Sequence, residues 1–320
     1  MQTNAPQTAV RTFSLHFLEA YVTTMRPYLL FVSGITGVAG ASLVAGIDSI
    51  RALPVLLASF LSYGFGQALT DCFQTDTDTL SAPYRPLTRG VVTQRQVLLT
   101  SLAGLGGCVA IFALGHPFTL LLGMIGVLGL ATYSFFKRRW WGGPFYNAWI
   151  VTNLSLIAFV AAGRTTAVPP GDGFGWMLAA VFWGYANFVL SGYFKDIEAD
   201  RATGYNTLPV VYGRRVASIT SDCFAFLAAG SAILAVRDLS APVVLFLASG
   251  IAMSVIAQVR LHGNTQDADA HTAIAPVVHS YILTLSGVAV SRQPDWVLPL
   301  LLLYAGFVLT MRLRPAHNQI

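Results

Sequence analysis

Residues 193–213 read YFKDIEADRATGYNTLPVVYG and follow directly on a run of apolar residues. Asp196 and Asp200 stand four positions apart, so on a continuing helix their side chains lie about 40° apart on one face, one turn from each other. Glu198 falls on the opposite side. Two stacked carboxylates at the end of a membrane helix are costly without a cation, and a hydrated divalent ion suits their oxygens. The stretch therefore predicts an ion site at the end of a membrane helix.

The composition of the whole chain is that of a polytopic membrane protein. Of its 320 residues, 55% are hydrophobic and 10% charged, and the mean hydropathy is +0.62. Soluble domains typically hold about 25% charged residues. The apolar segments have the length of spanning helices, about 20 residues, and lack the alternation of outer-membrane strands. We expect one all-α domain over residues 1–320, a polytopic transmembrane helical bundle of nine or ten helices.

Ten apolar segments are candidates for membrane helices. They cover residues 27–46, 52–70, 94–115, 118–136, 145–163, 174–193, 215–236, 240–260, 272–290 and 296–312. Two histidines and two serines interrupt the ninth, so nine spans with one re-entrant or tilted segment is an alternative. Residues 1–25 are expected to form a polar, disordered tail (1–11) and an interfacial amphipathic helix, because Phe13, Phe17 and Tyr21 recur every four residues. The first apolar run has no cleavage site and is expected to remain as a membrane helix.

Positive charge is distributed unevenly over these segments. With alternating spans, 15 of the 19 lysines and arginines fall on one side, and the four others are Arg51, Arg164, Arg237 and Arg292. The positive-inside rule makes the richer side cytoplasmic, and an even number of spans places both termini there. The net charge of +5 is thus explained by topology. We expect the lipid bilayer as surroundings, no nucleic-acid partner and no required protein partner.

Acidic residues gather on the same side, which topology does not require. They lie in two loops, after the second and sixth segments: Asp71, Asp76, Asp78, Asp196, Glu198 and Asp200. In the first loop, residues 66–90, the side chains of Asp71, Gln74 and Asp78 fall within about 60° of each other on a continuing helix, whereas Asp76 points elsewhere. The two stripes of oxygen donors occupy the same depth on the same side of the membrane.

Two facing stripes of oxygen donors surrounded by basic residues suit magnesium ions that bridge to a phosphate ligand. The basic residues are Arg85, Arg89, Lys137, Arg138, Lys195 and Arg201. Mg²⁺ takes one or two carboxylates and completes its shell with phosphate oxygens and water, and arginines hold the remaining oxygens. Inside a membrane bundle, the ligand should carry both a diphosphate and a hydrocarbon tail. Prenyl diphosphates have this structure.

These loops resemble the motifs of the UbiA superfamily of intramembrane prenyltransferases, a typically nine-helix fold. That family carries Asn-Asp-x-x-Asp-x-x-x-Asp after its second helix and Asp-x-x-x-Asp after its sixth. The second motif matches at Asp196 and Asp200, followed by Arg201, Gly204, Thr207, Leu208, Pro209 and Gly213. In the first, Thr70 takes the asparagine place, Asp71 and Asp78 match, and Gln74 replaces the middle aspartate. The resemblance covers about the first 215 residues, and the motif spacing is most similar to the chlorophyll synthase branch.

The resemblance implies a Mg²⁺-dependent enzyme. It would ionise a prenyl diphosphate, transfer the prenyl group to an aromatic or other lipophilic acceptor and release diphosphate. Tyr133 and Lys137 in the sequence YSFFKR match positions that the family places near the diphosphate. The implied metal ligands are, in order, Asp196, Asp200 and Asp78, then Asp71, Gln74 and Asp76, and the implied diphosphate contacts are Arg85, Lys195, Arg201 and Arg138. Gln74 brings no charge, so the first motif should bind metal more weakly.

An allylic carbocation requires a dry cavity lined by aromatic rings. Candidates are Phe60, Tyr63, Tyr146, Trp183, Tyr185 and Phe188, although each is also explained by helix packing. Asn147, Asn153 and Asn187 would orient the acceptor or bond neighbouring helices. Two alternatives stay open: a UbiA-type terpene cyclase that needs no acceptor, and an ion-coupled transporter. The position of the acids at one membrane face, away from the midplane, disfavours the transporter.

Overall fold

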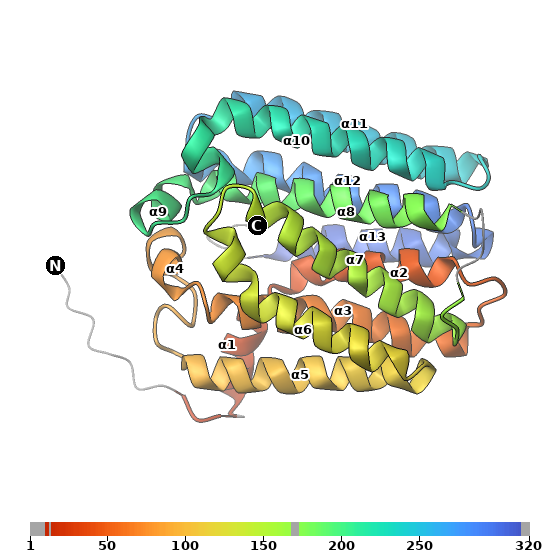
Figure 1. Cartoon of the computed structure of the whole chain (residues 1–320), viewed down its shortest axis with the longest axis horizontal. Helices are drawn as coiled ribbons and strands as arrows, with labels where there is room; N and C mark the ends of the chain where they lie inside the picture. The colour runs from red at the N-terminus through yellow and green to blue at the C-terminus, as the bar shows by residue number, and fades with distance from the viewer. Residues whose placement is uncertain (1–9, 13, 168–172, 315–320) are drawn as a thin grey trace.

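The computed structural model describes residues 10–12, 14–167 and 173–314. Over these residues the protein is a bundle of long helices, without strands, that run roughly side by side (Figure 1). The first half consists of α1 (Leu15–Met25), α2 (Leu30–Ser42), α3 (Ser49–Asp71), α4 (Thr75–Ser81), α5 (Gln94–Gly115), α6 (Phe118–Lys137) and α7 (Gly142–Gly163). The second consists of α8 (Phe174–Gly192), α9 (Ile197–Ala202), α10 (Leu208–Ala235), α11 (Ala241–Gly263), α12 (His271–Val290) and α13 (Val297–Leu313). Short 3₁₀ turns are η1 (Pro27–Leu29), η2 (Tyr193–Lys195), η3 (Asp267–Asp269) and η4 (Pro294–Trp296).

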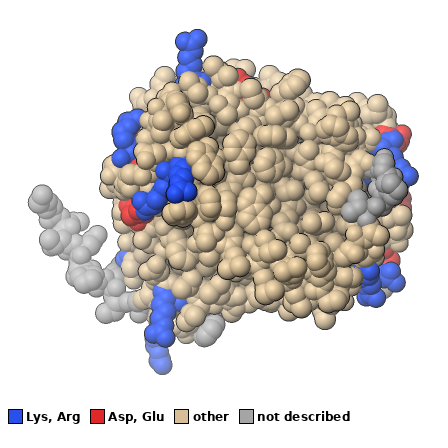
Figure 2. Space-filling model, in the orientation of Figure 1, with Lys and Arg blue, Asp and Glu red and all other residues tan. Residues whose placement is uncertain are grey.

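Nine helices of the described part are long and apolar enough to cross a membrane, namely α3, α5, α6, α7, α8, α10, α11, α12 and α13. Charged side chains gather toward the two ends of the bundle, and the broad middle of the visible face is neutral (Figure 2). The middle therefore presents the apolar surface that a bilayer requires. The predicted all-α membrane bundle is confirmed, whereas the cytoplasmic orientation stays a prediction.

All ten predicted segments contain a helix. The segment too short to span a membrane as one helix is the first, and not the ninth, which was expected to be irregular. Helix α2 has 13 residues, and with η1 it covers residues 27–42. Helix α12, expected to be irregular, is continuous from His271 to Val290 and is the most enclosed of the spans. Its polar groups find partners inside the bundle: the hydroxyl oxygens of Tyr281 and of Thr36 on α2 lie 2.7 Å apart. Polar residues thus mark a helix that faces protein on most sides, because such a helix need not be apolar throughout.

Capping residues explain where two of the long helices begin. The carboxylate of Asp48 accepts a hydrogen bond from the backbone N–H of Arg51 at the start of α3. At the start of α5, Thr93 and Gln96 form a capping box in which each side chain bonds the other residue's backbone N–H. These bonds satisfy N–H groups that have no partner inside the helix.

Helix α1 packs beside α3 with the predicted interfacial residues toward the bundle. Phe17 and Tyr21 are buried, and the Tyr21 hydroxyl lies 2.8 Å from Ser101 Oγ on α5. Leu15 and Leu18 face outward. Phe13 and most of the tail predicted to be disordered lie outside the described residues.

Candidate active site

Both acidic motifs lie where a long helix ends and a short one begins, at the same end of the bundle (Figure 1). Helix α3 ends at Asp71, the chain turns over Cys72–Gln74, and α4 follows. Likewise, α8 passes through η2 to Asp196, whose φ of −116° and ψ of 10° are not helical, and α9 follows. The continuous helices assumed from the sequence are therefore broken at both motifs. The breaks fold α4 and α9 across the bundle end, where the two short helices contact each other.

A polar chamber of about 120 Å³ lies beneath these turns. It collects most of the site residues predicted from the two motifs and from the end of α6. The predicted residues that line it are Asp71, Gln74, Asp78, Arg85, Tyr133, Lys137, Lys195 and Asp196. Further lining residues include Arg26, Tyr63, Gln67, Thr70, Asn147, Tyr185, Phe188 and Tyr193. The chamber thus combines oxygen ligands from both motifs with basic and aromatic side chains.

Arginines neutralise the buried acids of the first motif. Arg26 donates through one nitrogen to both oxygens of Asp71, at 3.1 and 2.9 Å. Arg85 lies 2.5 Å from Asp78 and 3.8 Å from Asp71. Burial raises the pKa of the Asp78 carboxyl, and the Arg85 guanidinium opposes that rise. These pairs place two positive charges beside the chamber, where a diphosphate would need them.

Lys137 connects the two motifs. Its Nζ donates to Gln74 Oε1 at 3.1 Å and lies 3.4 Å from Asp200 Oδ1. Asp200 is fully buried behind Lys137 and accepts hydrogen bonds from Thr77 and Thr207 at 3.2 and 3.4 Å. Burial raises the pKa of Asp200 to about 6, against the opposing effect of the Lys137 charge. The Lys137 side chain therefore lies between the Asp200 carboxylate and the chamber, and Asp200 itself does not line the chamber.

Besides the buried Asp200, three of the predicted metal and diphosphate contacts do not line the chamber, namely Asp76, Arg138 and Arg201. Asp76 is half-exposed and is bound on the outer side of α4 by Arg138 at 2.6 Å and by the Tyr205 hydroxyl at 3.0 Å. The guanidinium of Arg138 stacks over the Tyr205 ring, 4.2 Å from its centroid. Arg201 is exposed. On the outer side, Arg138 and Tyr205 hold Asp76 of α4, and on the inner side the Thr77 hydroxyl of α4 donates to Asp200 of α9.

Two tyrosine hydroxyls meet in the chamber wall. Tyr133 and Tyr193 are buried, and their hydroxyl oxygens lie 2.9 Å apart. The Lys137 ammonium lies 5.5 Å from the centroid of the Tyr193 ring. Gly143 makes this arrangement possible, because a Cβ at that position would collide with the Tyr193 hydroxyl. The pair presents polarised aromatic rings next to the acid and base groups.

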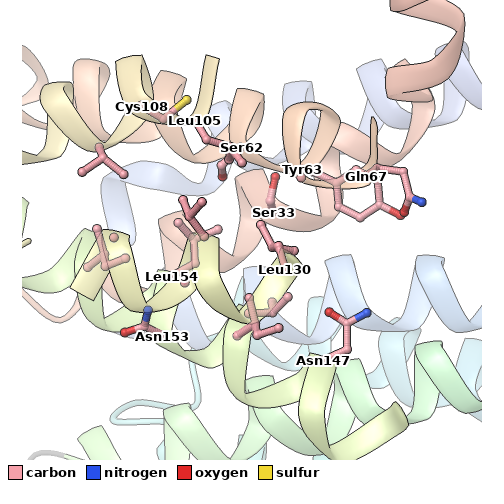
Figure 3. Close-up of a pocket in the computed structure, with 18 of the residues that line it drawn as sticks. Ser33, Ser62, Tyr63, Gln67, Leu105, Cys108, Leu130, Asn147, Asn153 and Leu154 are labelled. Carbon is pink, nitrogen blue, oxygen red and sulfur yellow. The ribbon is translucent and has the colours of Figure 1, made fainter. Parts of the chain in front are cut away.

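An apolar cavity of about 100 Å³ adjoins the chamber between α3, α5, α6 and α7. Figure 3 shows Gln67 and Asn147 at one end of it and Cys108 and Asn153 at the other. Five residues line both spaces, namely Tyr63, Gln67, Thr70, Asn147 and Tyr185. The polar chamber therefore continues directly into a mostly apolar one.

The aromatic candidates divide between the cavities and the helix contacts. Tyr63 and Tyr185 line both cavities, and Phe188 lines the chamber. The other three pack elsewhere: Phe60 edge-on to Phe31, Tyr146 stacked on Phe136, and Trp183 among Phe145, Phe182 and Phe224. For these three residues, contacts between helices account for the aromatic side chain.

The three asparagines divide in the same way. Asn147 lines both cavities. Asn153 lines the apolar cavity, but its Nδ2 donates to the Leu122 carbonyl at 2.9 Å and so bonds α7 to α6. Asn187 accepts a hydrogen bond from Ser221 and so bonds α8 to α10. Asn147 is the asparagine best placed to contact a ligand.

Sequence reasoning missed Arg26 and Tyr193 as residues of the chamber. In the sequence, Arg26 contributes only to the count of positive charges, although it directly precedes Pro27 at the start of the first apolar segment. Its φ of 52° is rare for a non-glycine residue and turns the chain between α1 and η1. Such strain persists where surrounding contacts enforce it, and here the bond to Asp71 does so. An arginine directly before a proline at the start of a membrane segment was the feature of the sequence that could have indicated Arg26.

The family model described as the UbiA prenyltransferase family matches residues 30–280. The chain belongs to this family. The membership confirms the predicted family and the predicted class of enzyme, a prenyltransferase, and disfavours a transporter. Helix α13 lies beyond the matched residues of this UbiA-family protein. The proposed likeness to the chlorophyll synthase branch stays a prediction.

Curated relatives of this prenyltransferase include two archaeal digeranylgeranylglyceryl phosphate synthases. The protein of Pyrococcus abyssi is 28% identical over 233 residues, which cover 69% of this chain and 78% of the relative. That of Natronomonas pharaonis is 28% identical over 251 residues, which cover 75% and 83%. The alignments thus include most of each relative.

Solved structures of UbiA homologues share the fold. The apo structure of the Aeropyrum pernix homologue has a TM-score of 0.67 and 20% identity, and the match covers 84% of this chain and 98% of that one. The Archaeoglobus fulgidus homologue bound to GPP and Mg²⁺ has a TM-score of 0.63 and 17% identity, with 86% and 99% covered. The predicted UbiA-like bundle is therefore confirmed.

Proposed function

We propose that this UbiA-family protein is a Mg²⁺-dependent prenyltransferase that ionises a prenyl diphosphate and transfers the prenyl group to a lipophilic acceptor. The observation that carries the proposal is the charged chamber that opens into an apolar cavity. A diphosphate requires the first space and an isoprenoid tail the second. The A. fulgidus homologue, bound to GPP and Mg²⁺, and the curated relatives, named as synthases of a prenylated glyceryl phosphate, support this combination.

The donor set suits Mg²⁺, a hard cation that prefers oxygen ligands. Asp71, Asp78, Asp196 and Asp200 are the proposed ligands, with the Gln74 carbonyl as a neutral one. Three of these acids are now paired with Arg26, Arg85 and Lys137. Bound Mg²⁺ would neutralise charge on the diphosphate and so favour its departure. The acids would then exchange basic partners for metal.

The basic side chains released in this exchange, together with Lys195, would hold the phosphate oxygens. Arg26, Arg85, Lys137 and Lys195 all line the chamber and can donate to the diphosphate as the allylic carbon–oxygen bond breaks. The bonding electron pair leaves with the diphosphate. Charge that develops on the leaving group is thus met by donors already in position.

The tyrosine-rich wall would protect the carbocation. Tyr63 and Tyr185 line both cavities where they meet, and Tyr133 and Tyr193 line the chamber, so their ring faces would stabilise positive charge and exclude water. The acceptor would then supply an electron pair to the allylic carbon and lose a proton to a base, as which the released diphosphate can serve, with Asn147 as an orienting group. Both motif loops are proposed to face the cytoplasm, and no protein partner is proposed to be required.

Diphosphate release by the purified protein in lipid nanodiscs tests the proposal. We expect release from geranyl diphosphate that requires both Mg²⁺ and a lipophilic acceptor, and that falls by about 10³-fold or more in Asp196→Asn and Asp200→Asn. Glu198→Gln is the matched control, because this side chain lies between the two aspartates in sequence but is exposed. Unchanged release in both aspartate variants would remove the proposal. A hydrocarbon product without acceptor would instead establish the cyclase.

A further inference from the structure

The apolar cavity has an open end at the chamber and a closed end deeper in the membrane. Its lining residues nearest the chamber include Gln67 and Thr70 on α3 and Asn147 on α7. Following each helix away from the chamber, the last lining residues are Phe112 on α5, Gly123 on α6 and Ile157 on α7. The Phe112 side chain is 2% exposed and is the largest of these three groups. An aromatic ring therefore forms much of the floor.

Close helix contacts lie directly beneath this floor. One turn after Phe112, Gly115 approaches the Ala161 carbonyl so closely that a Cβ would collide with it. Within the cavity wall, α5 and α6 also pack closely, since a Cβ on Gly123 would lie 2.6 Å from a methyl group of Val109. Backbones in contact leave no room for a chain to pass, and packed helices separate only at substantial cost. The cavity therefore ends at Phe112 and does not continue as a tunnel.

The depth of the cavity converts into a chain length. From Asn147 to Ile157, α7 rises about 15 Å, at about 1.5 Å per residue. An extended chain advances about 1.2 Å per backbone bond, as an extended polypeptide does, so about twelve bonds fit in this depth. Each isoprene unit contributes four main-chain bonds, and about three units therefore reach the floor.

We propose that Phe112 closes the tail cavity and limits the prenyl diphosphate to about farnesyl length. This inference rests on the proposed function, because it assigns the cavity to the tail of the substrate. It concerns substrate selection and not the chemical step, since Phe112 lies at the opposite end of the cavity from the acids. Truncating the ring should lower the floor, and filling the cavity nearer the chamber should raise it.

Two variants move the limit in opposite directions. Phe112→Ala removes the ring, while the hydrogen bond from His116 N to the Phe112 carbonyl is a backbone contact and can persist. Gly126→Leu fills the cavity from α6, about 4.5 Å nearer the chamber than Gly123. A Cβ at Gly126 meets only Asn153 Nδ2 within 4 Å, at 3.4 Å, so there is room for the backbone to stay in place. Leu114→Ala is the control, because this side chain on the same helix is 81% exposed toward the lipid.

The experiment compares kcat/KM for geranyl, farnesyl and geranylgeranyl diphosphate at saturating acceptor. The wild type and Leu114→Ala should prefer farnesyl over geranylgeranyl by about tenfold or more, the effect of a few methylenes that find no space. In Phe112→Ala that preference should disappear. In Gly126→Leu, farnesyl should lose about tenfold relative to geranyl. An unchanged length profile in whichever variant folds, or equal use of all lengths by the wild type, would overturn the assignment of Phe112.

Failure of this inference is separable from failure of the proposed function. Unreactive prenyl thiolodiphosphates of the same lengths can be compared by the thermal stabilisation that binding produces. A wild type that releases diphosphate but shows no length limit refutes the role of Phe112 alone. A wild type that binds these analogues with the expected length limit but never releases diphosphate from the substrates refutes the proposed reaction and supports the cavity assignment.

Discussion

The two motif loops carry similar acids but neutralise them differently. In the first loop, Asp71 and Asp78 are bound by two arginines, and the middle position is the neutral Gln74. In the second, the buried Asp200 is bound by a lysine and two threonine hydroxyls. Arginine presents several donors in a fixed planar fork, whereas lysine is a single compact charge on a flexible chain. The acids of the first loop are thus held by two guanidinium groups, while Asp200 in the second is held by one ammonium group and two neutral hydroxyls.

Lys137 is the sharpest test of that difference, because it contacts both loops. Lys137→Met keeps the length of the side chain but removes the charge opposite Asp200 and the donor to Gln74. We expect diphosphate release to fall by about 10³-fold, the effect of losing a charged group that stabilises a leaving group. Release at saturating Mg²⁺ measures this loss.

Arg139→Met is the control for the Lys137 variant. It removes a positive charge two residues away, from a side chain that is exposed and lies over the Phe135 ring. Activity within about threefold of the wild type is expected, since exposed charges are well screened. Equal losses in the two variants would show that net charge at the membrane surface matters and not the contact with both loops.

The architecture was predictable from the sequence because the bilayer permits few solutions. Long apolar segments must be helices, and positively charged loops group on one side. The two motifs could be paired across 125 residues because this topology brings the ends of the second and sixth segments to one side. The continuous helix assumed for Asp71, Gln74 and Asp78 was wrong, yet the three residues still meet because the turn after Asp71 folds α4 over the chamber.

The contacts inside the chamber were not predictable in the same way. Arg26 reaches Asp71 across 45 residues, and nothing local connects them. The positions of the aromatic residues were also not predictable from hydropathy, because the bundle interior and the lipid are both apolar. Hydropathy therefore does not distinguish Tyr185, which lines the chamber, from Trp183, two residues earlier, which packs against α7 and α10.

Placing an acid at position 74 should strengthen Mg²⁺ binding by the first loop, with a smaller effect on activity than the loss of Lys137. Gln74→Asp adds a carboxylate that can ligate Mg²⁺ and compete with Asp200 for Lys137. We expect the Mg²⁺ concentration for half-maximal release to fall about tenfold, as an added charge-assisted interaction is worth about 1.5 kcal/mol or more. A Mg²⁺ titration at saturating prenyl diphosphate measures the shift, and Gln74→Asn, which keeps the carbonyl but adds no charge, should not produce it. An unchanged half-saturation would mean that position 74 does not contact the metal.

Asp76 provides the smallest expected effect and separates the two sides of the first loop. The sequence offered it as a metal ligand, whereas its carboxylate lies outside the chamber with Arg138 and Tyr205. Both partners of the ion pair are 43% exposed, so Asp76→Asn should lower stability by at most about 1 kcal/mol. Release should stay within about threefold of the wild type with an unchanged Mg²⁺ requirement, whereas Asp78→Asn, two residues later and buried in the chamber, should lose most activity. If the two variants lose activity equally, then α4 must turn during catalysis and carry Asp76 inward, and the separation between the outer and inner sides of this loop would not hold in the working enzyme.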